Sequence, residues 1–358
     1  MHEDLHYAVL HEFVAPARRN LSQGTWDYLM GGAETETTQQ RNRLALDALA
    51  FRPRVLRNVE TVDTRGKVLG RELRLPVILA PIGSLQDMVP GGGEAPTRAA
   101  AAFGVVHMLS SACSPGLETV AACNDHPKIF QLYVRGDRAW VDDHIARAVA
   151  NGYIALALTV DLDYYGRRER DLAKRYQTTS RRTRPADHFQ ARFSWADVDR
   201  LKAKFKLPFI LKGIATAEDA RIAVEHGMEA VYVSNHGGRQ LDHGKGAVAV
   251  LPEVVEAVAG RAEVYVDGGF LRGGDIVKAM ALGANAVGIG RLQGLALAAG
   301  GEAGLVRALE LLQDEVTRCL GLLGVTSFAE LNPSFIASVA PIMRPWLDSA
   351  FPLLKEGY

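Results

Sequence analysis

Polar side chains that could do chemistry recur at the ends of short apolar segments along the chain. Lys212, His236 and Asp267 are examples, and such groups are rarely buried in a core strand unless they are paired or contact a ligand. The full set is Ser110, Gln131, Tyr133, Thr159, Asp161, Lys212, Asn235, His236, Arg239, Asp267, Gly290 and Arg291. Because so many equivalent segments end in this way, the pattern predicts one shared ligand site rather than core packing.

The stretch SNHGGRQLD at residues 234–242 contains the groups best suited to catalysis. His236 precedes two glycines at a predicted strand end, a poor position for packing and a good one for meeting a ligand. Its imidazole could take a proton from a carbon or hydroxyl, while Arg239 could pair bidentately with a neighbouring carboxylate. Asp161 could orient the imidazole and stabilise its cationic form. A lone histidine is more often a packed core residue, so the prediction depends on these neighbours.

The candidate residues follow eight apolar segments that alternate with helical patterns. The segments are residues 76–81, 105–111, 128–134, 153–161, 209–213, 231–235, 264–269 and 286–291. Continuous apolar segments are typical of strands buried on both faces of a parallel sheet. Eight such strands predict an α/β fold of the closed (β/α)8, or TIM, barrel type. The competing open sheet would carry a GxGxxG loop after its first strand, and residues 82–95 do not match that loop.

Helix boundaries support a repeated unit. The helical pattern at residues 218–226 has Thr216 as a candidate cap and Gly227 as a candidate stop. Three further glycines stand between a helical pattern and the next apolar segment: Gly104, Gly152 and Gly283. This recurrence is what a barrel of equivalent units would produce.

Two glycine-rich motifs end the last two predicted strands. DGGFLRGGD at 267–275 offers backbone N–H groups that can approach an anion closely, and GIGR at 288–291 adds a guanidinium fork. Each motif alone could serve only to make a tight turn. Loops at these two places in a barrel commonly bind phosphate, so the pair predicts a phosphorylated cofactor or substrate.

Two segments lie outside the predicted strands of a single domain over residues 1–358. Residues 1–70 are predicted to form an N-terminal helical cap. Residues 162–194 form a long loop after the fourth strand, on the face where barrel active sites lie, so we expect an active-site lid. Between Arg167 and Arg192 this loop has eight Arg and one Lys against Glu169, Asp171 and Asp187. It is either a solvated, partly disordered loop or an electropositive gate for an anionic substrate.

Composition excludes several other classes of protein. The chain has 358 residues, 48% of them hydrophobic, which is ample for a core, and its 35 glycines exclude a coiled coil. The 41 basic and 41 acidic residues argue against a nucleic-acid partner. Three dispersed cysteines predict no disulfide framework and no metal site. We see no signal peptide and no membrane segment, and we expect a soluble, cytoplasmic protein.

The motifs together resemble one flavoprotein family. SNHGGRQLD, taken with FQLY, LTVD, GRRE, LKG, VDGG and GIGR in this order, is similar to the FMN-dependent α-hydroxy-acid oxidase/dehydrogenase family, of the glycolate oxidase, lactate oxidase and mandelate dehydrogenase type. The resemblance covers residues 28–335. It implies bound FMN and oxidation of an (S)-2-hydroxy acid to the 2-oxo acid, with two electrons passing to flavin N5. It also implies reoxidation by O2, giving H2O2, or by another acceptor, and a homotetramer.

The resemblance implies a role for each matching residue. His236 would be the catalytic base, with Asp161 as its carboxylate partner and Tyr133 near the substrate hydroxyl. The substrate would be bound by Tyr28, Tyr133, Arg168 and Arg239. The cofactor would be held by Pro81, Ile82, Gly83, Ser110, Gln131, Thr159, Lys212, Ser234, Asp267, Gly269, Gly290 and Arg291. Within that set, Lys212 would stabilise the negative charge of reduced flavin.

Some positions depart from the family pattern. After VDGG the family usually has two arginines, but here Leu271 precedes Arg272, so we expect weaker retention of FMN. Gly83 and Ser84 are small, and Ala112 stands where glycolate oxidase has a large aromatic residue. These residues predict a roomier pocket and a substrate with a longer or aromatic side chain.

Three other functions are compatible with parts of the sequence. A type 2 isopentenyl diphosphate isomerase is also an FMN barrel, but the SNHGGRQLD and GRRE pair is suited to a carboxylate. A tailoring oxidase acting on a modified peptide or other large carboxylate-bearing substrate could keep every catalytic residue. A catalytically silent barrel scaffold would have lost the base or the flavin contacts, and both are present.

Overall fold

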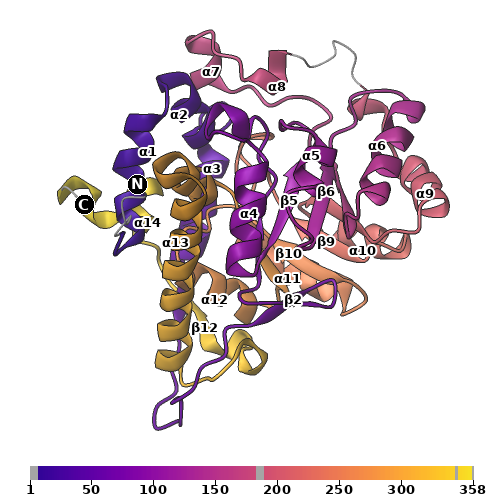
Figure 1. Ribbon diagram of the computed structural model, residues 1–358. Coiled ribbons are helices and arrows are strands. Elements are labelled where there is room, and N and C mark those ends of the chain that lie inside the picture. Colours follow the sequence, from indigo (N-terminus) through magenta and orange to yellow (C-terminus); the bar gives the residue numbers. More distant parts are fainter. Residues whose placement is uncertain (1–6, 183–188, 343–345, 357–358) are drawn as a thin grey trace.

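Eight parallel strands close into a barrel in the computed structural model, which describes residues 7–182, 189–342 and 346–356 (Figure 1). The barrel strands are β4 (Val77–Leu79), β5 (Val106–Ser110), β6 (Lys128–Leu132), β7 (Ala155–Thr159), β8 (Phe209–Ile214), β9 (Ala230–Val233), β10 (Glu263–Val266) and β11 (Ala286–Ile289). Each strand pairs with the next, and β11 pairs with β4 to close the barrel. The predicted (β/α)8 barrel is confirmed, and each strand falls at its predicted segment.

A ring of helices surrounds the barrel. Its members are α4 (Glu94–Phe103), α5 (Leu117–Ala121), α6 (Arg138–Ala150), α9 (Trp195–Lys204), α10 (Ala217–Glu225), α11 (Ala247–Val258), α12 (Gly273–Ala281) and the long α13 (Arg291–Leu323), which bends at Gly300 and Gly301. The predicted cap of α10 is confirmed, because the Thr216 side chain accepts a hydrogen bond from the Asp219 N–H. The four predicted stop glycines all adopt positive φ, at Gly104, Gly152, Gly227 and Gly283.

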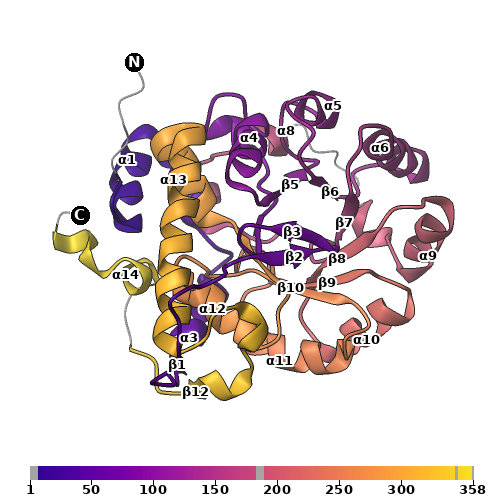
Figure 2. The ribbon, with the colours of Figure 1, turned by 60° about the horizontal axis from the view of Figure 1, so that its bottom comes forward.

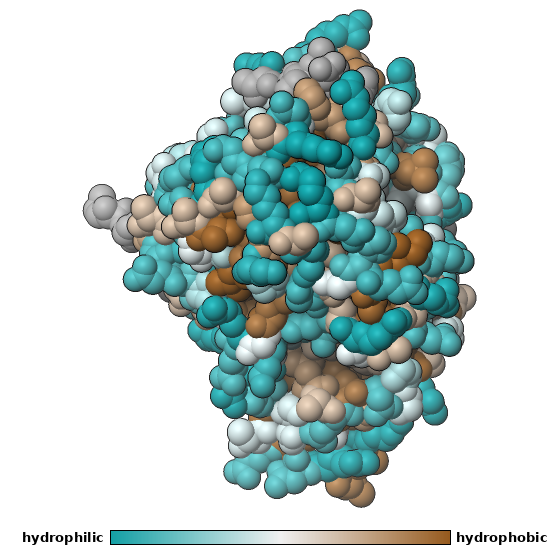
Figure 3. Space-filling model, turned by 90° about the vertical axis from the view of Figure 1, so that its right-hand side faces the viewer, coloured by the Kyte–Doolittle hydropathy of each residue, from teal (hydrophilic) through white to brown (hydrophobic). Residues whose placement is uncertain are grey.

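The outer side over α6, α9 and α10 is mostly hydrophilic, with hydrophobic residues in several separate patches (Figure 3). Ion pairs join neighbouring elements there, such as Arg200 with Asp142 at 2.7 Å and Lys202 with Glu229 at 2.6 Å. This side therefore has the character of the solvent face of an α/β barrel. Within the described ranges, no helix combines the length and the apolar character that crossing a membrane requires.

The N-terminal helices end earlier than predicted. They are η1 (Leu10–Phe13), α1 (Val14–Asn20), α2 (Gln23–Met30) and α3 (Thr37–Asp47). The prediction of helix up to residue 70 was wrong beyond Asp47, because β1 (Leu49–Phe51) pairs antiparallel with β12 (Ile336–Ser338) near the end of the chain. Three-residue strands are too short to show a period, and their partners are remote in sequence.

A hairpin closes the bottom of the barrel (Figure 2). Its strands, β2 (Gly66–Val68) and β3 (Arg71–Leu73), are joined by Leu69 and Gly70, both at positive φ. Val68 and Leu73 pack against side chains that fill the barrel interior. The Glu263 carboxylate, at the start of β10, accepts hydrogen bonds from the Leu69 and Gly70 N–H groups at 3.0 and 3.3 Å.

The lid lies over the top of the barrel (Figure 1) and has three short helices, α7 (Glu169–Ala173), α8 (Thr179–Arg182) and η3 (Gln190–Arg192). Lid residues bind the N-terminal helices and the β4 loop, as in the Arg170–Glu36 ion pair at 2.6 Å. Many of the described residues of this segment are exposed, as expected of a solvated loop, and Asp187 lies outside the described residues. The remaining elements are η2 (Leu85–Asp87), η4 (Phe328–Glu330), η5 (Pro333–Phe335), α14 (Trp346–Ala350) and η6 (Pro352–Glu356).

Candidate active site

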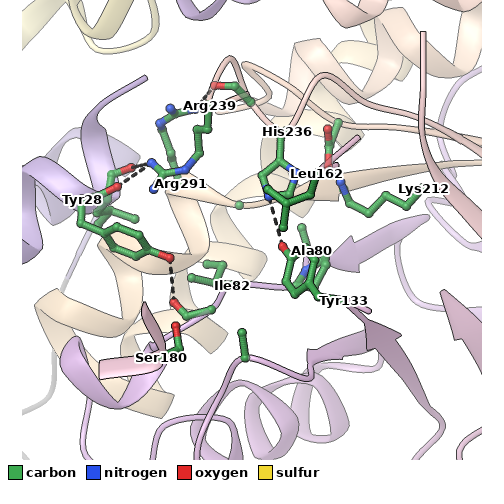
Figure 4. A pocket seen from close by; sticks show the side chains of 18 of the residues that line it. Tyr28, Ala80, Ile82, Tyr133, Leu162, Ser180, Lys212, His236, Arg239 and Arg291 are labelled. Carbon is green, nitrogen blue, oxygen red and sulfur yellow. Dashed lines mark hydrogen bonds and ion pairs between the residues drawn. The ribbon is translucent and has the colours of Figure 1, made fainter. Parts of the chain in front are cut away.

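A pocket of about 1370 Å³, counting its solvent-filled mouth, opens at the C-terminal ends of the barrel strands. Its walls come from three parts of the chain: the barrel loops, α2 and the lid (Figure 4). Thirteen of the predicted site residues line it: Tyr28, Pro81, Ile82, Gly83, Tyr133, Arg168, Lys212, His236, Arg239, Asp267, Gly269, Gly290 and Arg291. Five predicted site residues do not line the pocket, and they act on it only through the residues that do or at its floor. They are Ser110, Gln131, Thr159, Asp161 and Ser234.

His236 bridges two predicted partners. Its Nδ1 lies 3.0 Å from Asp161 Oδ1, and its Nε2 lies 3.1 Å from the Tyr133 hydroxyl. With Nδ1–H donating to the carboxylate, Nε2 keeps its lone pair for the pocket side. The backbone of His236 is left-handed, with φ at 57°, and its N–H donates to Ser234 Oγ at 3.1 Å. The turn after β9 therefore holds the imidazole in one orientation.

The local electrostatics suit a base. Burial lowers the pKa of His236, and the Asp161 carboxylate opposes that effect only in part. Burial alone would raise the pKa of Asp161, but the interactions with His236, helped by the charge of Lys212, together outweigh it and hold this pKa below its ordinary value. Gly213, at φ 117°, allows the close approach, because a Cβ there would lie 2.8 Å from Asp161 Cβ. The imidazole is thus kept neutral, with a carboxylate ready to stabilise it when it gains a proton.

Two arginines flank Tyr28 at one wall of the pocket. The Arg239 and Arg168 guanidinium carbons lie 4.7 and 5.7 Å from the centre of the Tyr28 ring. Burial lowers the pKa of Arg239, and Arg168 lowers it further. The Tyr28 hydroxyl donates to the Gly83 carbonyl at 3.1 Å. Two partly desolvated cations side by side favour binding of an anion, and a carboxylate matches the guanidinium fork.

The floor of the pocket joins β8, β9 and β10 through a polar network. Lys212 Nζ lies 2.8 Å from both Asp267 Oδ2 and Ser234 Oγ, and Ser234 donates to Asp267 Oδ1 at 2.6 Å. On the next strands, Gln131 Nε2 donates to Thr159 Oγ1 at 2.8 Å. Gln131 Oε1 is buried, and no described residue donates a hydrogen bond to it. This oxygen is therefore available to accept a hydrogen bond from a ligand, such as one from an N–H of a flavin ring.

The predicted phosphate end is built from glycines and one arginine. Gly268 and Gly269 adopt φ of 103° and 85°, and a Cβ at Gly290 would meet only open space. Arg291 donates to the carbonyls of Gly237 and Gly31 at 2.9 and 2.8 Å. Burial, helped by Arg239, lowers the pKa of Arg291 to about 9. An anion beside this buried guanidinium would reverse that effect.

Leu271 occupies the position where the family pattern has an arginine, and Arg272 follows it. Arg272 pairs with Glu315 and donates to the Ala350 carbonyl at 2.9 Å, so it does not line the pocket. Leu271 does line the pocket and is buried. Arg272 therefore does not take over the contact that the family pattern places at residue 271.

The residues present fit FMN. The pocket combines a cation at Lys212 on its polar floor with a glycine-lined end and Arg291, and Gln131, which does not line the pocket, has a buried oxygen with no donor among the described residues. Lys212 would face the ring carbonyl that gains negative charge on reduction, and Gly269, Gly290 and Arg291 would hold the phosphate. When bound there, FMN accepts the two electrons of the oxidation.

Sequence reasoning missed part of the pocket wall. The lid supplies Tyr165, Ser180, Arg181 and Gln190, and the loop after β6 supplies Arg135. From α3, Asn42 donates to Asn235 at 2.9 Å and Gln39 accepts from Arg291 at 3.0 Å. The basic content of the lid was the one signal that pointed to Arg181. Nothing local in the sequence points to Asn42 or Gln39.

Comparison with known proteins defines the class first. The sequence model of the FMN-dependent dehydrogenases matches residues 17–338. Glycolate oxidase 1 of Zea mays is 40% identical over 347 residues, which cover 91% of this chain and 94% of that protein. The rat 2-hydroxyacid oxidase 2 (Rattus norvegicus) is 36% identical over 343 residues, covering 91% and 97%. The chain belongs to the FMN-dependent dehydrogenase family.

Solved structures agree with this membership. Mandelate oxidase in complex with benzoyl-formic acid superposes with a TM-score of 0.86 at 37% identity, covering 94% of this chain and 100% of that one. A chimera of (S)-mandelate dehydrogenase gives a TM-score of 0.87 at 32% identity, covering 92% and 99%. The protein is an FMN-dependent oxidoreductase that oxidises 2-hydroxy acids. The tailoring oxidase is not favoured by these findings.

Proposed function

We propose that this enzyme oxidises an (S)-2-hydroxy acid larger than glycolate, with His236 as the base. The assignment rests on the hydrogen bonds that join Asp161 to His236 and His236 to Tyr133, and of these residues His236 and Tyr133 line the pocket. His236 takes a proton from the substrate at Nε2, while Asp161 stabilises the imidazolium that forms. The oxidation removes two protons and two electrons from the substrate: His236 takes one proton, and bound FMN would take up the two electrons and the second proton, which leaves the 2-oxo acid.

Substrate orientation follows from the groups around the base. Arg168 and Arg239 bind the carboxylate, and Tyr28 lies between the two guanidinium groups and the β4 loop. The Tyr133 hydroxyl, already bonded to His236, meets the substrate hydroxyl. These contacts place the carbon-bound and oxygen-bound protons within reach of the base.

The proposed size of the substrate rests on the wall opposite the arginines. A Cβ on Gly83 would lie 3.3 Å from Ala112 Cβ and 3.5 Å from the Tyr28 hydroxyl. A Cβ at residue 83 would thus already crowd Ala112, so this side of the pocket stays open only while both residues are small. Leu162 and Ile82 add apolar surface to the same pocket (Figure 4). A substrate side chain with several carbon atoms uses this space and surface better than glycolate does.

Anaerobic reduction of the flavin tests the proposal. Purified holoenzyme is mixed without oxygen with glycolate and with longer and aryl 2-hydroxy acids, and flavin absorbance is followed. We expect faster bleaching by a larger substrate than by glycolate, and return of the yellow colour on admission of air. Fastest bleaching by glycolate would contradict the size assignment.

A pair of variants tests the assignment of the base. His236→Ala should abolish bleaching while FMN stays bound. His243→Ala changes an exposed histidine of the same loop and should bleach like the unaltered enzyme. Normal bleaching by His236→Ala would contradict its role.

We propose further that the enzyme is a homotetramer in the cytoplasm, with O2 or another acceptor reoxidising the flavin. Support comes from the family resemblance and from the three cysteines, which are all free in the structure. Light scattering coupled to size exclusion measures the mass of the particle. H2O2 formation on reoxidation distinguishes O2 from another acceptor.

A further inference from the structure

We propose that the lid carries a second anion subsite, and that the preferred substrate is a 2-hydroxy acid with another carboxylate at the far end of its side chain. The residues are Arg181 of α8, with Arg135 of the β6 loop beside it, and both line the pocket. The inference rests on the proposed function, because it assigns the far end of the same substrate. The α-carboxylate and the FMN phosphate already have their own cations in Arg168, Arg239 and Arg291.

Tyr165 separates the two proposed anion sites. The Arg168 guanidinium carbon lies 4.2 Å from the centre of the Tyr165 ring, and that of Arg181 lies 4.4 Å from the same centre. The two cations are thus neighbours on one aromatic ring, and both belong to the lid segment, Arg168 just before α7 and Arg181 on α8. A short chain of methylene groups could join carboxylates bound at these two places.

The charge balance of the pocket leaves Arg181 without an acidic counterpart of its own. Among the residues that the structure describes, Asp161 is matched by His236 and Asp267 by Lys212. Two further acids lie on this side: the buried Asp171, which interacts electrostatically with Arg239, Arg168 and Arg181, and Asp87, whose carboxylate accepts hydrogen bonds from Thr179 of α8. Two carboxylates beside three guanidinium groups still leave net positive charge, which favours an anionic ligand.

The position of Arg181 is fixed by its neighbours on α8. Ser84 Oγ donates to Ser180 Oγ at 2.6 Å and accepts from the Ser180 N–H at 3.0 Å. The Asp87 carboxylate accepts from the Thr179 N–H and hydroxyl at 2.9 and 2.6 Å. Arg135 Nη1 donates to the Ser180 carbonyl at 3.3 Å. The first turn of α8 is therefore tied to the β4 and β6 loops, and Arg181 on this turn is a half-buried residue.

The middle of the pocket suits a hydrocarbon chain. Ala112, Tyr133, Leu162 and Tyr165 form one apolar cluster. Figure 4 shows Ile82 between the Tyr28 side and Ser180 of the lid. A substrate that spans from the arginine pair to the lid would bury its methylene groups against these side chains. An uncharged side chain of equal length would fill the same space but leave Arg181 without a ligand.

The test compares substrates of equal length on the holoenzyme. The KM for turnover, with O2 or a dye as the electron acceptor, is measured with 2-hydroxyglutarate and with 2-hydroxypentanoate, whose side chains differ in the distal carboxylate. We expect a KM about 10- to 100-fold lower for the dicarboxylate, the range for a hydrogen bond to a charged group. Added salt should narrow this ratio. Equal KM values, or a lower one for 2-hydroxypentanoate, would overturn the proposal.

Two matched variants test whether the difference in KM between the two substrates depends on Arg181. Arg181→Met should raise the KM for 2-hydroxyglutarate to that of the monocarboxylate, with kcat for both little changed. Arg182→Met alters the exposed neighbour, which does not line the pocket, and should leave both KM values as they were. An equal rise for both substrates in Arg181→Met would show a structural role and overturn the assignment. The comparison on the unaltered enzyme decides the matter even if a variant does not fold.

Failure of the proposed function is recognised separately. If no 2-hydroxy acid larger than glycolate, aryl ones included, bleaches the flavin, the proposed function fails. The subsite is then judged by binding alone, from the change in flavin absorbance on titration with 2-oxoglutarate and with 2-oxopentanoate. Tighter binding of 2-oxoglutarate supports the subsite, and equal binding overturns it.

Discussion

The two ends of the barrel are made by the same eight strands but carry opposite kinds of side chain. At the bottom, Val68 and Leu73 of the hairpin enter the barrel and pack on its apolar filling. One charged group there, Glu263, accepts hydrogen bonds from the Leu69 and Gly70 N–H groups and from the Tyr265 hydroxyl at 2.6 Å. At the top, Lys212, His236 and Arg239 line an open pocket.

The difference separates stability from function along each strand. A charge at the bottom is satisfied by the protein itself, so it adds nothing that a ligand could use. Charges at the top are only partly compensated, and burial shifts the pKa values of His236 and Arg239 downward. Such partly satisfied groups cost folding free energy and are kept for the ligands that complete them. Substitutions at the two ends should therefore have separable effects.

The largest effect is expected from Asp161→Asn at the top. Loss of the carboxylate removes the group that stabilises the imidazolium, so kcat should fall by roughly 10²- to 10⁴-fold. FMN content and thermal stability should stay close to those of the unaltered enzyme. Rapid-reaction measurement of flavin reduction gives the rate. Asp163→Asn, at an exposed neighbouring position, is the control and should retain its activity.

Leu73→Ala at the bottom of the barrel should lower stability and leave catalysis unchanged. Its side chain is buried in the barrel plug, so the free energy of unfolding should fall by about 2–5 kcal/mol. The kcat per bound flavin should be unchanged, because the plug does not reach the pocket. Urea denaturation and steady-state assays measure the two quantities. Glu72→Ala, an exposed position of the same strand, should change neither, and a loss of kcat in Leu73→Ala would break the separation.

Leu271→Arg tests whether the glycine-lined end of the pocket binds the phosphate of FMN. An arginine at this pocket-lining position adds a charge-assisted contact to the cofactor phosphate, so FMN should bind about 10- to 100-fold more tightly. Titration of the apoprotein with FMN, followed by flavin fluorescence, measures the dissociation constant. Leu271→Met keeps the position apolar and should bind FMN as the unaltered chain does. Weaker binding by Leu271→Arg would contradict the assignment of this end.

The smallest effect concerns pH. A base is inactive when protonated, and burial lowers the pKa of His236 below the ordinary imidazole value of about 6.5. As pH falls through 6.5, kcat/KM should therefore hold, and it should decline only at lower pH. In Asp161→Asn the decline should move lower still, because the carboxylate that raises this pKa is gone. A decline of kcat/KM that begins above pH 6.5 would contradict the prediction.

Much of the fold was predictable because its signals are local. Each barrel strand is a continuous apolar segment, and the Thr216 cap and the stop glycines are read from single residues and their neighbours. The pairing of β1 with β12 was not predictable, since neither three-residue strand has a pattern of its own. The hairpin plug likewise depends on packing against the finished barrel interior.

The site residues also fall into two groups, those that the sequence could predict and those that it could not. His236, Arg239 and Asp161 were identified because strand ends of a parallel barrel meet, so the topology places them together. Arg181, Ser180 and Gln190 were missed because their positions depend on how the lid crosses the pocket. Gln190, for example, donates to the Thr159 carbonyl at 3.0 Å, a contact between segments that no sequence period links.

The ribbon of β1 and β12 affects how the chain matures during synthesis. Leu49–Phe51 emerges from the ribosome early, and its partner Ile336–Ser338 emerges near the end. Likewise β4 must wait for β11 before the barrel can close. The nascent chain therefore carries open strand edges for most of translation, a state prone to aggregation that chaperones protect. Cofactor loading should accordingly follow the emergence of β11, because the barrel that holds the site closes only then.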